Sequence, residues 1–224
     1  MVTSYLGGLG MRTIITISRE FGSGGRDIAR AIAKYYDIPY YDNELLSRAA
    51  KDSGISEGVF ESHDEKPTSS FLYSLVVESY TAGYIGNNYA EMPINQKIFL
   101  AQFDAIKKIA EEGPCVLIGR CADYALEGNK DRLSIFIHGS LENRMKRVVR
   151  DFRVSESKAK ELITKTDKRR ATYYNYYTNK KWGHCSSYDL TIDSALLGVN
   201  GSIELIKEYI RIREDLVDRN SVVF

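Results

Sequence analysis

Residues 12–36 join a β-branched run, a glycine-rich turn and an amphipathic segment with no linker between them. The run RTIITIS at 12–18 is typical of a buried parallel strand. After the turn, apolar side chains recur at helical spacing over 27–36, which predicts a helix that packs through one face. Because a strand that leads directly into a helix begins a βαβ unit, this stretch restricts the chain to an α/β architecture.

Four more short apolar runs predict further strands, at about 38–41, 115–119, 133–138 and 188–193. Helical segments separate these runs, and Ser140 and Ser202 are candidate N-caps of two of the helices. Strands that alternate with helices form a parallel sheet covered on both faces. We therefore expect a doubly wound, five-stranded parallel sheet with helices on both faces, whose ligands bind beyond the carboxyl ends of the strands.

The turn after the first strand has the composition of an anion-binding loop. Backbone N–H groups converge in such a turn, and the helix that follows adds partial positive charge. The residues that would line it are Gly22, Ser23, Gly24 and Gly25. Relative to the pattern G-x-x-x-x-G-K-[ST], Glu20 replaces the first glycine, Arg26 the lysine and Asp27 the hydroxyl residue. Arg26 can grip two phosphate oxygens, and Asp27 offers a hard oxygen ligand to Mg²⁺.

Two other interpretations of this turn remain open. A glycine-rich turn can serve the fold alone, without any ligand. A dinucleotide-binding turn requires G-x-G-x-x-G, and Asp27 occupies the place of the third glycine. Asp42 nevertheless lies close to the distance expected for the acid that binds the ribose.

Segments beyond the loop resemble the cytidylate kinases, and most closely their divergent cytidylate kinase-like branch. YYDNELLSRAA resembles the segment in which a strand ends in an aspartate, here Asp42, and a helix carries an arginine, here Arg48. GPCVLIGRCADYAL is similar to the segment with a strand, a glycine and an arginine, here Gly119 and Arg120. Two later segments also match, SIFIHGSLENRMKRVVR and YDLTIDSALLGVNGSIELI. The resemblance covers nearly the whole chain from Met11.

The resemblance implies a P-loop NTPase-type fold and a single nucleoside-monophosphate kinase-like domain over residues 1–224. The implied parts are a core of 11–53 and 96–224, an acceptor-side helical insertion at about 54–95, and a lid at about 155–182. The resemblance also implies that Arg48 holds the acceptor monophosphate and that Asp42 lies near the acceptor. Gln102, on a helix predicted over 96–112, is a candidate either to read the acceptor base or to lie on the surface.

Phosphoryl transfer between nucleotides brings two polyanions together, so cations must approach from several directions. The candidate catalytic residues are Arg26, Arg120, Arg169 and Arg170. Arg169 and Arg170 precede a tyrosine cluster in DKRRATYYNYY, an arrangement that fits a lid over phosphates. A solvated basic helix face is the alternative, and the sequence does not decide which of the two arginines contacts phosphate.

The resemblance thus implies an ATP-dependent phosphotransferase that uses Mg²⁺. Its acceptor would be a nucleoside monophosphate similar to CMP or dCMP, or another small molecule. The absent loop lysine favours a second hypothesis, a regulatory protein that binds nucleotide with little or no turnover. A dinucleotide-dependent oxidoreductase is the third hypothesis.

The net charge and the length of the apolar runs argue against two classes of partner, nucleic acids and membranes. The net charge of +1 provides no basic field to attract nucleic acid. No run reaches the ~18 apolar residues of a membrane span, and the first ten residues lack the pattern of a signal peptide. We expect a cytoplasmic protein with small nucleotide substrates and no nucleic-acid or membrane partner; monomer and homodimer both remain open.

Overall fold

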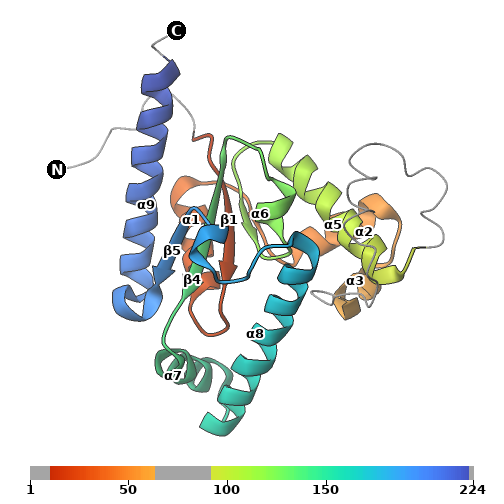
Figure 1. The fold of residues 1–224 in the computed structure, drawn as a ribbon, viewed down its shortest axis with the longest axis vertical. Coiled ribbons are helices and arrows are strands. Elements are labelled where there is room, and N and C mark those ends of the chain that lie inside the picture. The colour runs from red at the N-terminus through yellow and green to blue at the C-terminus, as the bar shows by residue number, and fades with distance from the viewer. Residues whose placement is uncertain (1–10, 64–91, 222–224) are drawn as a thin grey trace.

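The computed structural model describes residues 11–63 and 92–221. Within them a parallel sheet of five strands runs in the order β2-β3-β1-β4-β5 (Figure 1). The strands are β1 Ile14–Arg19, β2 Tyr40–Tyr41, β3 Val116–Ile118, β4 Arg132–His138 and β5 Leu190–Asp193. The predicted fold class is therefore confirmed. Since β1 is central, the loop that follows it opens between the ends of β3 and β4.

The helices alternate with these strands along the chain. They are α1 Gly25–Tyr36, α2 Glu44–Ser53, α3 Glu57–His63, α5 Ile94–Glu111, α6 Ala122–Ala125, α7 Leu141–Phe152, α8 Glu156–Thr178 and α9 Ser194–Ser221. Ser140 is confirmed as a cap, because its Oγ accepts from Asn143 N. The prediction for Ser202 was wrong: α9 kinks at Gly198, the helix resumes before Ser202, and the Ser202 hydroxyl donates back to Gly198 O at 2.7 Å.

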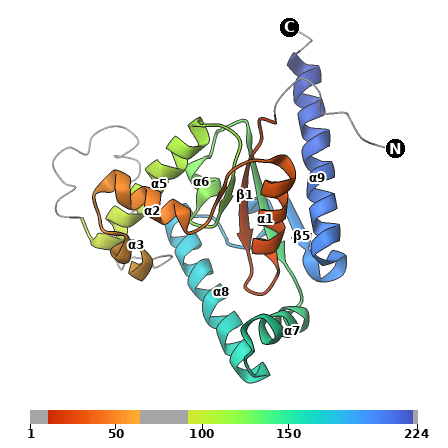
Figure 2. The ribbon, with the colours of Figure 1, turned by 180° about the vertical axis from the view of Figure 1, so that it is seen from behind.

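Two helices cover one face of the sheet. Figure 2 shows α1 and α9 side by side against it. Their apolar side chains join alternate residues of the strands in one core cluster, which includes Ile15, Ile17, Ile28, Ile32, Ile135, Ile206 and Ile210. Side chains alternate between the two faces along each strand, so every second strand residue points to this face. These side chains form the apolar surface on which α1 and α9 pack.

The opposite face carries an aromatic core. Side chains of α5, α6 and α8 pack there, among them Phe99, Phe103, Tyr173, Tyr174 and Tyr177. Phe99 and Tyr177 stack with ring centroids 4.1 Å apart, and both are fully buried. The tyrosines of α8 thus fasten one end of this helix to the body of the protein.

The helices α7 and α8 lie beyond the carboxyl edge of the sheet. In Figure 1 β1 points toward them, and the loop after β1 lies between the strand and these helices. They form a small apolar cluster of their own through Val148, Ala159 and Ile163, and Phe21 from the loop packs against it. The loop after β1 is therefore supported from the far side by the α7–α8 pair.

The predicted insertion at about 54–95 lies mostly outside the described residues. Its described part holds α3 and the first residues of α5. The predicted lid at about 155–182 corresponds to α8, a single continuous helix of 23 residues, and the following segment. Among residues 11–63 and 92–221, no helix combines the length and the apolar character needed to cross a membrane.

Candidate active site

The loop between β1 and α1 turns through two left-handed glycines. Gly22 and Gly24 have φ of 80° and 81°, in the left-handed region that favours glycine. A β-carbon at Gly22 would also lie 2.9 Å from Arg144 O, so only glycine fits there. The Ser23 hydroxyl donates to Glu20 O at 2.8 Å and accepts from Gly25 N, which closes the turn.

The loop ends at the N-terminus of α1. Gly24 is its N-cap, and no side chain caps the helix. The N–H groups of the first helical turn, including those of Arg26 and Asp27, have no partner within a helix. Together with the helix dipole they make this end of α1 attractive to an anion such as phosphate.

Two charged residues outside the loop hold it in place. Asp167, on α8, accepts from Phe21 N at 2.7 Å and pairs with Arg144 of α7. The Arg144 Nε donates to Gly139 O at 3.0 Å and lies 3.3 Å from Glu20 Oε2. Both side chains are largely buried. Asp167 was not among the predicted residues, because its carboxylate binds a backbone N–H and no sequence motif marks such a contact.

The carboxylate of Asp42 joins the loop arginine to the third strand. Arg26 Nε lies 2.8 Å from Asp42 Oδ2. Arg120 Nη1 donates to Asp42 O at 2.8 Å and lies 3.6 Å from Asp42 Oδ1. Asp42 and Arg120 are both buried, whereas half of the Arg26 side chain is exposed. The structure therefore brings together three of the residues predicted for the site.

A strained turn directs Arg120. Gly119, Arg120 and Cys121 follow β3 with φ of 65°, 51° and 55°, three left-handed residues in succession. Such a conformation costs about 1–3 kcal/mol at each residue other than glycine. The turn is stabilised by its contacts, including the bonds from Arg120 to Asp42 O and to Ile118 O.

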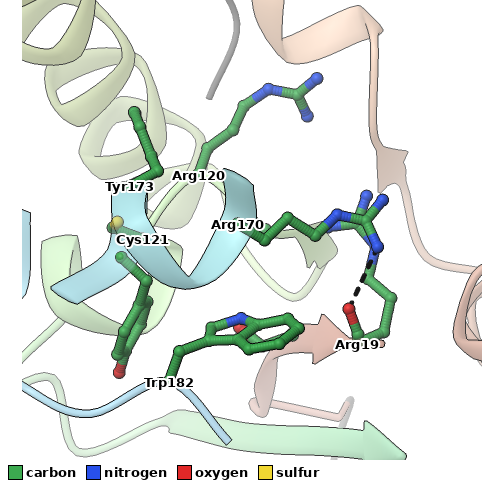
Figure 3. A pocket seen from close by; sticks show the side chains of 9 residues that line it. Arg19, Arg120, Cys121, Arg170, Tyr173 and Trp182 are labelled. Carbon is green, nitrogen blue, oxygen red and sulfur yellow. Dashed lines mark hydrogen bonds between the residues drawn. The ribbon is translucent and has the colours of Figure 1, made fainter. Parts of the chain in front are cut away.

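A small, narrow cleft lies beside this turn, at the carboxyl ends of β1 and β3. Figure 3 shows that arginines from three elements line it: Arg19 from β1, Arg120 from the turn after β3, and Arg170 from α8. Arg170 Nη1 donates to Arg19 O at 3.1 Å. Trp182 and two tyrosines of α8 complete the lining. Arg19 was not among the predicted residues, because it precedes the loop and lies outside its motif.

A buried acid supports the wall of this cleft. Asp123, on α6, is almost completely buried, and the Tyr174 hydroxyl donates to its Oδ2 at 2.6 Å. Burial raises the pKa of Asp123, and burial together with this carboxyl raises the pKa of Tyr174. The pair ties α6 to α8 and thereby fixes the position of Tyr174 in the cleft.

The raised pKa of Asp123 predicts a pH dependence of stability. An acid whose pKa is higher in the folded protein favours folding most below its unfolded value of about 3.9, and this contribution is lost as pH rises through the folded value. Asp123→Asn should remove this pH-dependent loss of folding stability, because asparagine does not ionise. The free energy of unfolding of the variant, measured by urea titration, should therefore rise relative to wild type above pH ~4. The slope is at most about 1.4 kcal/mol per pH unit, and a constant difference between pH 4 and pH 8 would contradict the prediction.

Two other predicted residues, Arg48 and Arg169, lie apart from this group, and a third, Gln102, meets the cleft through Tyr173. Arg48 pairs with Glu112 at the end of α5, with Nη1 2.8 Å from Glu112 Oε2. Gln102 is buried on α5; its Oε1 accepts from the Tyr173 hydroxyl at 3.1 Å, and its Nε2 has no hydrogen-bond partner among the described residues. Arg169 is exposed on α8, so of the two neighbouring arginines only Arg170 lines the cleft.

The donor set at the loop fits a magnesium ion bound together with phosphate. Mg²⁺ usually takes one or two carboxylates and completes its coordination with phosphate oxygens and water. Asp27 offers one largely exposed carboxylate in the first turn of α1. In the described ranges no three acidic, histidine or cysteine side chains form a metal cluster. Asp27 would thus hold the ion only alongside a bound nucleotide.

Comparison with known proteins identifies the family of this chain. Residues 14–196 match the family model described as "Cytidylate kinase-like family". This chain belongs to the cytidylate kinase-like family. The matched range includes the loop, Asp42, the turn after β3 and the whole of α8.

Two relatives illustrate the similarity of the cytidylate kinase-like chain to other proteins. A curated cytidylate kinase of Pyrobaculum islandicum (strain DSM 4184 / JCM 9189 / GEO3) is 26% identical over 199 residues, which cover 88% of this chain and 92% of that protein. The crystal structure of an uncharacterized protein from Eubacterium ventriosum ATCC 27560 has a TM-score of 0.68 at 32% identity, and the match covers 89% of this chain and 99% of that one. The family and the fold support a kinase of nucleotides or small molecules.

Proposed function

We propose that this protein is an ATP-dependent phosphotransferase that moves the γ-phosphoryl group to a small anionic acceptor, with a nucleoside monophosphate such as CMP or dCMP as the first candidate. One observation carries the proposal. A glycine loop at the N-terminus of α1 lies next to arginines from separate elements, Arg26, Arg120 and Arg170. Phosphoryl transfer needs this combination of backbone donors and cations.

In this proposal each part of the site has a separate task. The amides at Gly22–Gly25 and the first turn of α1 bind the phosphates of ATP. Asp27 would hold Mg²⁺, whose charge neutralises phosphate oxygens. Arg26 lies between the loop and the acceptor side and would stabilise the transferring group. Arg120 and Arg170 would bind the anionic end of the acceptor in the cleft.

The remaining candidates are proposed to serve the acceptor side. Asp42 would hold Arg26 and Arg120 in position, and Gln102 would use its amide N–H groups for a polar edge of the acceptor. Arg48 would contact the acceptor only after its guanidinium group leaves Glu112. Arg169 is proposed to act from the lid at long range, since its side chain is exposed.

Two measurements test the proposal. ATP with Mg²⁺ should raise the melting temperature of the full chain, because a ligand that binds only the native state stabilises it by mass action. Steady-state ADP release should then appear with at least one member of a panel of nucleoside monophosphates and small alcohols. A melting temperature that does not respond to ATP would contradict the proposal.

A regulatory role is the second candidate, and it is favoured by the loop itself. The lysine of the usual pattern is absent, and the residue in its place, Arg26, pairs with Asp42. Nucleotide binding without ADP release for any acceptor would support this candidate over the enzyme. ADP release that requires one particular acceptor would exclude the regulatory role.

A further inference from the structure

The first residue of α9 carries a buried hydroxyl whose partners lie in other parts of the chain. The Ser194 Oγ lies 2.7 Å from Ser23 O and 2.8 Å from His138 O. Ser23 belongs to the glycine loop, residues 22–25, and His138 is the last residue of β4. One hydroxyl thus joins the glycine loop, the end of β4 and the start of α9.

The polar groups of Ser23 are all held by hydrogen bonds. Its N–H and its hydroxyl donate to Glu20 O at 3.3 and 2.8 Å, and its Oγ accepts from Gly25 N at 3.3 Å. These bonds are local, since both partners lie within three residues of Ser23. The remaining group is the carbonyl, and its donor, Ser194, lies 171 residues later in the chain. The conformation of the loop at Ser23 therefore depends on α9.

The Ser23 carbonyl fixes the direction of the next N–H group. The peptide bond from Ser23 to Gly24 is trans, and in a planar trans peptide the C=O and the N–H point in opposite directions. Because the carbonyl is held toward Ser194, the Gly24 N–H points away from it. Among residues 11–63 and 92–221, no hydrogen bond uses the Gly24 N–H. This N–H lies at the start of α1, where an anion is favoured.

The glycine that follows Ser23 makes such an anchor necessary. Gly24 is the N-cap of α1 and has φ of 81°. Glycine populates positive and negative φ about as readily, so the peptide plane before it can rotate between two orientations. Rotation would reverse the Gly24 N–H and would carry the Ser23 carbonyl away from Ser194. The hydrogen bond from Ser194 therefore holds one of the two orientations.

The end of β4 supports the same arrangement. A serine hydroxyl has one proton, which the carbonyls of Ser23 and His138 share. The next residue after His138, Gly139, donates its N–H to the Glu20 carboxylate at 3.0 Å. The glycine loop is thus tied to the end of β4 at two points, through Ser194 and through Glu20. The loop peptide is held against the sheet as well as by its own turn.

We propose that Ser194 is a positioning residue of the phosphate loop: by holding the Ser23 carbonyl, it directs the Gly24 N–H toward a bound phosphate group. Ser194 itself does not contact the phosphate. The proposal rests on the proposed function, because it requires that the phosphates of ATP bind at this loop.

Calorimetric titration of the full chain tests this role, with inorganic tripolyphosphate and with a non-hydrolysable ATP analogue, each with Mg²⁺. Ser194→Ala should raise both Kd values about tenfold, the lower end for one hydrogen bond to a charged group, because the amide is misdirected and not removed. Ser194→Thr keeps the hydroxyl and should stay within about threefold of wild type.

Ser202→Ala is the matched control. Ser202 is also buried on α9, and its hydroxyl donates within its own helix to Gly198 O at 2.7 Å. The variant loses the same atom and the same kind of bond as Ser194→Ala. Its melting temperature should fall by a similar amount, but both Kd values should stay within about twofold of wild type.

The amide proton of Gly24 gives a readout that a purely structural role would not change. In a ¹⁵N-labelled wild-type chain saturated with tripolyphosphate, this proton should move downfield, because it donates to a charged oxygen. In Ser194→Ala at equal saturation the displacement should be smaller, and in Ser202→Ala it should equal that of wild type.

The role of Ser194 would be contradicted by equal Kd changes in Ser194→Ala and Ser202→Ala, which would indicate only a general loss of stability. A loss of affinity for the ATP analogue without one for tripolyphosphate would also contradict it, since the contact is with phosphate. So would a Gly24 proton that does not move when the wild-type chain binds tripolyphosphate. A wild-type chain that binds neither probe would instead contradict the proposed function itself.

Discussion

Replacing Arg26 with alanine should lower kcat by about 100- to 1,000-fold while the fold stays intact, the usual range for loss of one group that stabilises the transition state. The guanidinium group lies between the phosphate loop and Asp42, where it would face the charge that develops during transfer. Its side chain is half exposed, and Arg120 remains beside Asp42. The melting temperature should therefore change little. ADP release at saturating ATP and acceptor measures the effect.

Arg30 provides a matched control on the same helix. It is exposed one turn further along α1, with its guanidinium 5.6 Å from the Tyr40 ring centroid. Arg30→Ala removes the same charge from the same helix and reaches Asp42 only through Tyr40, whose hydroxyl donates to Asp42 Oδ2 at 3.3 Å. A similar fall in kcat for both variants would indicate a general electrostatic effect, and an unchanged kcat in Arg26→Ala would remove Arg26 from the mechanism.

Much of the sheet could be predicted because its three inner strands are short, rich in β-branched residues and almost fully buried. The run at 12–18 is rich in β-branched residues, which is typical of a strand buried on both faces of a parallel sheet. The observed strand β1 covers Ile14–Arg19. The two edge strands were predicted less accurately: 38–41 was expected and β2 covers Tyr40–Tyr41, and 188–193 was expected and β5 covers Leu190–Asp193. Pro39 has no N–H to donate, although its carbonyl still accepts from Val116 N at 2.8 Å. The order of the strands in the sheet depends on tertiary packing, which no local sequence pattern encodes.

The site was predictable where a motif marks it and not where tertiary contacts build it. The glycines stand at a strand end in a loop motif, and Asp42 stands at a strand end in a segment that resembles the cytidylate kinases, which made them candidates. Asp167 lies 146 residues from Phe21, whose N–H it accepts, and Arg19 lines the cleft while its carbonyl accepts from Arg170. Neither contact leaves a repeated pattern in the sequence. The direction in which Arg26 points depends likewise on Asp42, which only the folded chain brings near.

Replacing Arg120 with alanine should be the most damaging single change, because it affects stability and transfer together. The Arg120 side chain is almost fully buried beside the buried carboxylate of Asp42. Removing one partner of a buried pair typically costs about 3–5 kcal/mol, since the other charge is left behind. Arg26 still contacts Asp42, so we expect the lower end, about 3 kcal/mol by urea unfolding. ADP release with the acceptor should fall by at least about 100-fold.

A double variant separates these two effects. Asp42→Asn combined with Arg120→Met removes both buried charges and fills much of the volume, so it should recover most of the lost stability. Transfer should not recover, because the guanidinium that would bind the acceptor anion is still missing from the cleft. If the double variant regained both stability and ADP release, the only task of Arg120 would be to neutralise Asp42. Recovery of the fold without recovery of transfer would instead assign Arg120 to the acceptor, provided that Asp42→Asn alone keeps ADP release, since loss of the carboxylate that also holds Arg26 would then not explain the inactivity.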